Sequence, residues 1–213
     1  FDLDATVDGT HPNDYGMMLQ AQAYEKKLRL ILQEPSGSLV TQIPVRQSRE
    51  PGSYNWEERH NTVKTLNATE PSKILFIGNS ITHNWGGKPL NNRIKGADSW
   101  AQYLEPLQTR NLGFGWDRIE NVLWRVYHDE LTGIQPEKIV LNIGTNDLLI
   151  NTDEEIVAGL AFLLEAIKTR QPKAKIHVLG LYPRREQETR ILQLNAKIQQ
   201  MTKNQAVSYG NIG

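Results

Sequence analysis

The segment SKILFIGNS, residues 72–80, decides the fold of this 213-residue chain. Its apolar run ILFI is continuous rather than alternating, and it ends in a Gly-Asn-Ser turn. Continuous apolar strands rich in branched side chains are typical of parallel sheets, whose two faces are both covered by helices. The sequence therefore predicts a parallel sheet. The same pattern recurs three times, at residues 138–143, 175–181 and 207–212.

Amphipathic helices are expected between these strands. Residues 117–127 repeat apolar side chains at three- and four-residue spacings, the pattern of a helix with one buried face. The Thr152-x-x-Glu155 pattern is a capping box that opens a second helix, and a third is expected at about residues 186–203. A short fifth strand is expected to end near Asn111. This order predicts an α/β fold, a three-layer α/β/α sandwich around a central, mainly parallel five-stranded sheet with right-handed crossovers.

One domain is predicted for residues 1–213, in three parts. Residues 1–33 contain a helix, at about residues 13–32, whose apolar side chains predict one buried stripe. Residues 34–55 contain several Pro and Gly without periodicity, which predicts a long surface connector. Residues 56–213 contain the remainder of the fold and begin with a short helix. The predicted stripe consists of Met17, Ala21, Tyr24, Leu28 and Leu32.

The composition excludes several classes of function. Lys+Arg and Asp+Glu both number 24, so no excess of charge indicates nucleic acid or an anionic membrane as a partner, and a neutral substrate is expected. The absence of Cys excludes disulfides, thiolate metal sites and a cysteine nucleophile. No apolar run approaches 18 residues. The chain opens with Phe1 rather than Met, which favours a secreted or periplasmic protein that has lost an export signal or upstream domain, although the compartment stays open.

Three loops are expected to carry the chemistry, because ligands of open parallel sheets bind at the carboxyl ends of the strands. Acyl transfer needs a nucleophilic hydroxyl, a base, a group that orients the base, and donors for the oxyanion. Ser80 would offer its hydroxyl and its own backbone N–H, and Asn146 its side-chain amide. The turn at Gly115-Trp116 would add a backbone N–H, helped by the positive end of the following helix dipole. The loops are residues 78–82, 113–117 and 144–147.

The base is predicted to be His11, one of five histidines. A catalytic imidazole needs a partner on its other ring nitrogen to fix its tautomer. His11 alone has an Asp three residues before it, so Asp8 would accept from one ring nitrogen and leave the other for Ser80. His83 lies nearer to Ser80 in sequence, but its side chain is expected to point elsewhere. No metal and no organic cofactor are implied.

Four blocks of this sequence together resemble the SGNH, or GDSL-type, hydrolase superfamily. Within it, the text around NLGFGWD and VLNIGTND is similar to the catalytic subunits of platelet-activating-factor acetylhydrolase. The resemblance implies the flavodoxin-like SGNH fold, with Ser80 as nucleophile, His11 as base and Asp8 as its orienting acid. It also implies oxyanion donors at the Ser80 N–H, the second-block N–H and the Asn146 amide. The blocks are GNS at residues 78–80, NLGFGWD at 111–117, GTND at 144–147 and DGTH at 8–11.

Three features depart from the family pattern. Asn79 replaces the Asp that usually precedes the nucleophile, a change that activity is expected to survive. Trp116 replaces the oxyanion glycine, and its indole is expected to crowd the acyl pocket and favour acetyl. The DGTH block comes first instead of last, which predicts a circular permutation with residues 34–55 as the new link, since cuts in surface loops are well tolerated. A competing account makes residues 1–33 the tail of an upstream esterase domain, in which case His11 serves another chain or domain.

Each candidate also has a structural interpretation. Ser80 alone would fit a helix N-cap, the Asp8-x-x-His11 segment a turn before a helix, and the GTND block a capped turn. An exposed aromatic face suits a sugar ring, whereas a buried one indicates core packing. The candidate substrate contacts are Asn79, Trp85 and Trp116.

The sequence predicts a serine esterase that removes small acyl groups, above all acetyl, from carbohydrate through an acyl-enzyme intermediate. Its substrate would be a small-molecule or polysaccharide acetyl ester, with no nucleic-acid or membrane partner, and a homo-oligomer stays open. One alternative is a lipid acetylhydrolase or lysophospholipase. The other is a catalytically inactive sugar-binding module, which a serine-directed fluorophosphonate would leave unlabelled at Ser80.

Overall fold

The computed structural model describes residues 5–8 and 10–211. The chain divides into two compact units, which we call unit 1 (Phe1–Gly37) and unit 2 (Ser38–Gly213), and each is described by itself. The single domain and the circular permutation predicted from the sequence both join the two units, and they stay predictions.

Unit 1 contains a turn and one helix, α1 (Asp14–Ile31). A bridge between Thr6 and Pro12 closes the turn, and the Asn13 side chain accepts from the Gly16 N–H as the helix N-cap. The predicted helix is confirmed. Within unit 1 its apolar stripe is more than half exposed, and the predicted burial of that stripe stays a prediction. Periodicity shows which side chains share a face and not what covers that face. The exposed fractions are 55% for Met17, 64% for Tyr24, 53% for Leu28 and 64% for Leu32.

Unit 2 is built on a five-stranded sheet with the order β2-β1-β3-β4-β5. All four pairings are parallel, which confirms the fold class predicted from the apolar runs. The last strand is shorter than the predicted strand at residues 207–212. Residue 212 lies outside the described residues. The strands are β1 (Ile74–Gly78), β2 (Thr109–Gly113), β3 (Lys138–Asn142), β4 (Lys175–Leu179) and β5 (Ser208–Gly210).

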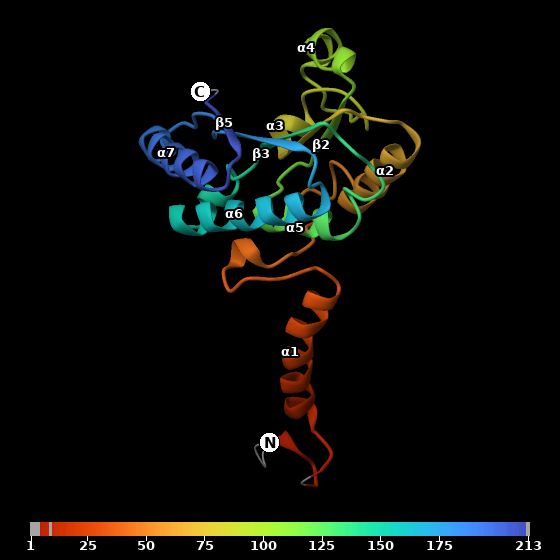
Figure 1. Ribbon diagram of the computed structural model, residues 1–213, viewed down its shortest axis with the longest axis vertical. Helices are drawn as coiled ribbons and strands as arrows, with labels where there is room; N and C mark the ends of the chain where they lie inside the picture. The colour runs from red at the N-terminus through yellow and green to blue at the C-terminus, as the bar shows by residue number, and fades with distance from the viewer. Residues whose placement is uncertain (1–4, 9, 212–213) are drawn as a thin grey trace. The chain divides into compact units, whose positions relative to one another are not determined.

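Helices connect the strands as predicted. The capping box is present, since Thr152 accepts from the Glu155 N–H and the Glu155 carboxylate accepts from the Thr152 N–H. Figure 1 shows α5 and α6 side by side along the sheet, with α3 on the other side. Among the described residues, no helix is both long and apolar enough to cross a bilayer. The α-helices are α2 (Trp56–Thr69), α3 (Ser80–His83), α4 (Ala97–Tyr103), α5 (Ile119–Tyr127), α6 (Asp153–Arg170) and α7 (Glu188–Asn204), and the 3₁₀ turns are η2 (Val40–Gln42), η3 (Glu105–Leu107) and η4 (Asp147–Leu149).

The main core lies between the sheet and these helices. Apolar side chains from the strands and from α5 and α6 are fully buried there, and burial of each such side chain stabilises the fold by about 1.5–3 kcal/mol relative to exposure. This core fixes the strands whose ends carry the three loops. It includes Leu75, Ile77, Ile139 and Leu141 from the sheet and Ile119, Val122, Ile156 and Leu163 from the helices.

Residues 38–55 belong to unit 2 and are anchored to it at a few buried positions, while most of the stretch is exposed. Their predicted role as a connector stays a prediction. Thr41 is fully buried, and its hydroxyl donates to the Glu155 carbonyl at the start of α6. The Val45 N–H donates to the Glu120 carbonyl at the start of α5. The Pro and Gly of this stretch thus go with an irregular, mostly exposed segment that contacts α5 and α6 at a few residues.

Candidate active site

The Ser80 segment leaves β1 through a close-packed turn. Asn79 is buried, and its side chain accepts from the Ile81 N–H at 2.9 Å as the N-cap of α3. A Cβ on Gly78 would lie 2.2 Å from the Thr82 hydroxyl, and one on Gly113 would lie 2.2 Å from the His83 nitrogen. Only glycine fits at either position, so α3 can lie directly on the ends of β1 and β2.

Ser80 is the first residue of α3 and is half-buried. The first N–H groups of a helix have no acceptor within the helix, so the Ser80 N–H points outward together with the positive end of the turn. The N-cap role that the sequence left open for Ser80 belongs to Asn79. Ser80 therefore offers both a hydroxyl and a backbone donor.

The three loops open at one edge of the sheet. Gly78 pairs with Gly113 of β2 and with Asn142 of β3, so these strands end level with one another. The third block also contacts the second directly: the Asn146 amide is buried and donates to the Asp117 carbonyl at 2.9 Å. An amide nitrogen carries two hydrogens, and this bond uses one.

The turn after β2 requires one correction. The Gly115 N–H, predicted as an oxyanion donor, donates to Nδ1 of His83 at 3.0 Å. Burial, followed by nearby arginines, lowers the pKa of His83 to about 3, so this ring stays neutral and accepts. The His83 ring therefore supports this turn, and among the described residues it makes no hydrogen bond to Ser80. The backbone donor left in this turn is the N–H of Trp116, a residue with φ +62° and a 38% exposed side chain.

Asp8 and His11 form the predicted pair within unit 1. Nδ1 of His11 lies 2.6 Å from the Asp8 carboxylate, which also accepts from the His11 N–H at 2.7 Å and the Thr10 N–H at 2.9 Å. The backbone bond from His11, followed by its ring, lowers the pKa of Asp8. The Asp8 carboxylate fixes the ring tautomer and leaves Nε2 of His11 as an acceptor. That Nε2 of His11 accepts the Ser80 proton stays a prediction.

A buried charge network lies beneath the second block, and the sequence interpretation missed it. Asp117 is fully buried and accepts from Arg125 at 2.9 Å, from the Trp56 indole at 2.7 Å and from Gln47 at 3.0 Å. Burial outweighs these donors and raises the pKa of Asp117 to about 6. Arg125 also pairs with buried Glu130. The sequence did hold an indication of it, because Arg125 comes three residues after Val122 and so lies on the apolar, buried face of α5.

Another buried carboxylate, that of Asp147, follows Asn146 in the sequence. Asp147 is fully buried and accepts from the Ile119 N–H at 3.3 Å, while its other oxygen has no hydrogen-bond partner among the described residues. Burial, followed by the nearby Glu120 carboxylate, raises the pKa of Asp147 to about 8. Asp147 is therefore mostly protonated at neutral pH.

Trp85 packs against other aromatic rings. Its indole N–H donates to the Ser99 hydroxyl at 2.9 Å, and its ring lies edge-on to Phe76 at 5.7 Å and Trp100 at 5.9 Å. This favours the core interpretation of Trp85 over stacking on a sugar. Trp116 is the exposed aromatic residue of the predicted pair.

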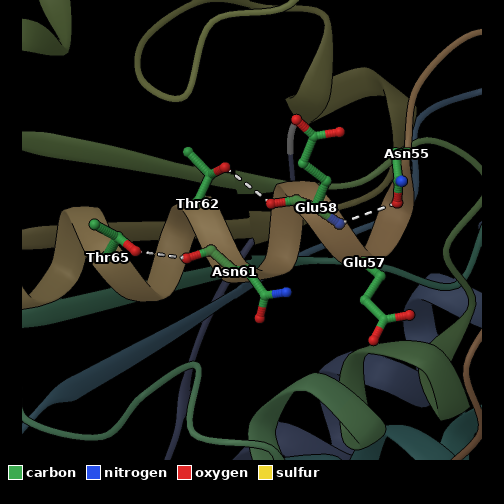
Figure 2. Close-up of a pocket in the computed structure, with 6 residues that line it drawn as sticks. All are labelled: Asn55, Glu57, Glu58, Asn61, Thr62 and Thr65. Atoms are coloured by element: carbon green, nitrogen blue, oxygen red, sulfur yellow. Dashed lines mark hydrogen bonds between the residues drawn. The ribbon is translucent and has the colours of Figure 1, made fainter.

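A large surface hollow lies away from these groups. It has a volume of about 510 Å³ and follows the outer side of α2. Figure 2 shows its side chains bonding within their own helix: Thr62 donates to the Glu58 carbonyl and Thr65 to the Asn61 carbonyl. None of the predicted site residues lines this hollow, and its side chains do not converge on one point, so it does not resemble an acyl-transfer site.

A family model matches the part of unit 2 that carries the three loops. The model of the GDSL-like Lipase/Acylhydrolase family matches residues 76–212, which include the Ser80, Trp116 and Asn146 loops. The chain belongs to this family. The resemblance noted in the sequence is thereby confirmed, whereas the permuted order of blocks stays a prediction.

Curated relatives include subunits of platelet-activating factor acetylhydrolase IB. The alpha2 subunit of Homo sapiens is 36% identical over 162 residues, which cover 76% of this chain and 66% of that protein. The alpha1 subunit of Bos taurus is 26% identical over 152 residues, covering 71% of this chain and 61% of that protein. The chain thus spans slightly under two thirds of the length of these relatives.

Solved structures share the fold. A protein from Streptococcus pneumonia, provisionally described as a platelet activating factor, superposes with a TM-score of 0.60 at 20% identity, covering 90% of this chain and 80% of that one. Axe2, an acetylxylan esterase from Geobacillus stearothermophilus, gives a TM-score of 0.50 at 18% identity, covering 67% and 77%. At these identities the likeness concerns the fold alone.

Proposed function

We propose that the protein is a serine esterase that hydrolyses acetyl and other short acyl esters through an acyl-enzyme intermediate. The observation that carries the proposal is the meeting of three loops at one sheet edge, where Ser80 begins α3, Trp116 follows β2 and Asn146 follows β3. Family membership supports the same reaction class.

In the proposed reaction, the Ser80 hydroxyl oxygen attacks the ester carbonyl carbon while Nε2 of His11 takes its proton. The Asp8 carboxylate stabilises the resulting imidazolium. Negative charge develops on the carbonyl oxygen, where the Ser80 N–H, the Trp116 N–H and the second hydrogen of the Asn146 amide donate to it. Collapse expels the alcohol, which takes the proton from His11. Water then releases the acid by the same sequence of steps.

The alcohol is proposed to be a carbohydrate, because the half-exposed indole of Trp116 would provide an aromatic face at the site. The packing of Trp85 removes one of the two aromatic residues that supported this substrate. A lipid acetyl ester is the second candidate, since the curated relatives are platelet-activating factor acetylhydrolase subunits. Both alcohols involve the same acyl chemistry at Ser80.

The reaction class is tested with p-nitrophenyl acetate and a fluorophosphonate. The protein should turn over the ester and be labelled at Ser80, whereas Ser80→Ala should do neither and should unfold at an unchanged temperature. A protein that hydrolyses the ester no faster than buffer, with Ser80 unlabelled, would be the inactive module instead. Comparing acetylated xylan with an acetyl glycerophospholipid then distinguishes the two alcohols.

A mixing experiment tests which serine His11 serves. Ser80→Ala and His11→Ala should each be inactive when assayed alone. If His11 serves the Ser80 of another chain, a mixture of the two variants recovers activity. If it serves Ser80 of its own chain, the mixture stays inactive. A fully active His11→Ala variant would remove this residue from the mechanism.

A further inference from the structure

The Gly115–Trp116 peptide is held by side chains from outside the second block. The Tyr54 hydroxyl donates to the Gly115 carbonyl at 2.7 Å, and the Gln47 amide donates to the same oxygen at 3.0 Å. The neighbouring Gly115 N–H donates to His83 at 3.0 Å. Tyr54 and Gln47 come from residues 38–55, and His83 comes from the helix that begins with Ser80.

These bonds determine the direction of the Trp116 N–H. The peptide is trans, so the Gly115 carbonyl and the Trp116 N–H lie in one plane and point in opposite directions. Two donors on the carbonyl fix the plane, and they therefore aim the N–H away from Tyr54 and Gln47. The left-handed φ of +62° at Trp116 accompanies this orientation.

The same bonds also affect the strength of the donor. A hydrogen bond to a carbonyl polarises the whole amide group and makes the N–H at its other end a better donor. An oxyanion donor gains from such polarisation because it acts in a site of low dielectric. The carbonyl bonds therefore supply orientation and polarity together.

The two donors are held firmly. Gln47 is 9% exposed, and its amide also donates to the buried carboxylate of Asp117 at 3.0 Å. The Tyr54 ring lies edge-on to the His83 ring at 4.8 Å. Burial raises the pKa of Tyr54, so its hydroxyl keeps its proton over the working pH range.

We propose that Tyr54 and Gln47 are positioning residues of the esterase, which hold the Gly115–Trp116 peptide so that the Trp116 N–H donates to the oxyanion. The inference rests on the proposed function. It adds two residues that precede every block of the family pattern found in unit 2. Neither touches the substrate, and both act through the peptide.

Two variants and a matched control test this role in steady-state assays. Tyr54→Phe and Gln47→Met should each lower kcat by on the order of 10-fold, part of the 10² to 10³ expected for losing a whole donor, while KM stays within about twofold. Gln171→Met is the control, because Gln171 is 7% exposed and its amide donates to the Leu131 and Ile134 carbonyls away from the site. It should leave kcat unchanged. An unchanged kcat in both test variants would overturn the role, as would an equal loss in the control.

A second measurement separates this inference from the reaction itself. The ¹³C shift of the Gly115 carbonyl and the ¹H shift of the Trp116 amide report the peptide without turnover. Tyr54→Phe and Gln47→Met should move both signals upfield, and Gln171→Met should not. Unchanged signals refute the peptide support even in an active enzyme. If the signals move in a protein that hydrolyses no ester, the support stands and the proposed function fails.

Discussion

Replacing Asp147 by Asn should stabilise the protein, and increasingly so as the pH rises. The Asp147 side chain is fully buried beside Glu120, and one of its oxygens has no hydrogen-bond partner in the part of the chain that the structure describes. Burial raises its pKa from 3.8 to about 8, so folding favours the protonated carboxyl. Asn has the same shape, keeps the acceptor for the Ile119 N–H and does not titrate.

The expected magnitude follows from the two pKa values. Between about pH 4 and pH 8 the native state keeps a proton that the unfolded chain has released, so stability falls by about 1.4 kcal/mol per pH unit as the pH rises. At pH 7, roughly three units above the unfolded pKa, this costs the native protein about 4 kcal/mol. Asp147→Asn removes that cost, and its advantage should shrink to near zero at about pH 4, where both states are protonated.

Urea denaturation followed by far-UV circular dichroism, at pH 4, 5.5, 7 and 8.5, measures the difference directly. Asp129→Asn is the control. The Asp129 side chain is 65% exposed, its pair with Lys64 is long at 3.6 Å, and Asn keeps the acceptor for the Thr132 hydroxyl at 3.2 Å. The control should change stability by less than about 0.5 kcal/mol at every pH. A pH-independent gain for Asp147→Asn, or a loss at pH 7, would refute the assignment of a buried, protonated carboxyl.

Three further predictions concern the site and its support. Asn146→Ala should lower kcat by on the order of 10² to 10³ with the fold intact, measured on p-nitrophenyl acetate. Trp116→Gly should relieve the left-handed backbone by roughly 1 kcal/mol and raise the ratio of p-nitrophenyl butyrate to acetate turnover, because the indole no longer limits the acyl pocket. Arg125→Met should destabilise the protein by about 3–5 kcal/mol in urea denaturation, because it leaves Asp117 and Glu130 buried without their cation.

Each of these has an outcome that contradicts it. Full activity of Asn146→Ala would exclude its amide as a donor, and an unchanged acyl preference in Trp116→Gly would place the indole outside the pocket. For Arg125, the comparison is Arg93→Met, which breaks a partly exposed pair with Glu50 and should cost less than about 1 kcal/mol. Similar losses in both arginine variants would show that burial of the pair does not matter.

The sheet and most helices were predictable because their signals are local. The apolar run before Ser80 and the Thr152 capping box each specify their own element, and both occur as predicted. Parallel pairing then places Ser80, Trp116 and Asn146 at one edge without any knowledge of contacts. Secondary structure and parallel pairing together were therefore enough to predict that the three candidate loops open at one edge of the sheet.

The support of those loops was not predictable in the same way. Tyr54 and Gln47 belong to a segment without periodicity, and their partner Gly115 lies 61 and 68 residues away. His83 was set aside as the base, and nothing near it in the sequence reveals that its ring accepts from the Gly115 N–H. Side-chain to backbone bonds across such separations follow from tertiary packing, which no local pattern encodes. Whether the α1 stripe is buried likewise depends on contacts that its own periodicity does not describe.

The position of the 38–55 segment has a consequence for protein engineering. The family match begins only at residue 76, so this stretch lies outside it, between the DGTH block at residues 8–11 and the Ser80 block. A mutagenesis library confined to it leaves the nucleophile and the Asn146 amide in place, yet it alters the bonds at the Gly115 carbonyl. If Tyr54 and Gln47 hold the peptide as proposed, substitutions in this stretch should change the catalytic rate, and shortened expression clones of this protein should keep it.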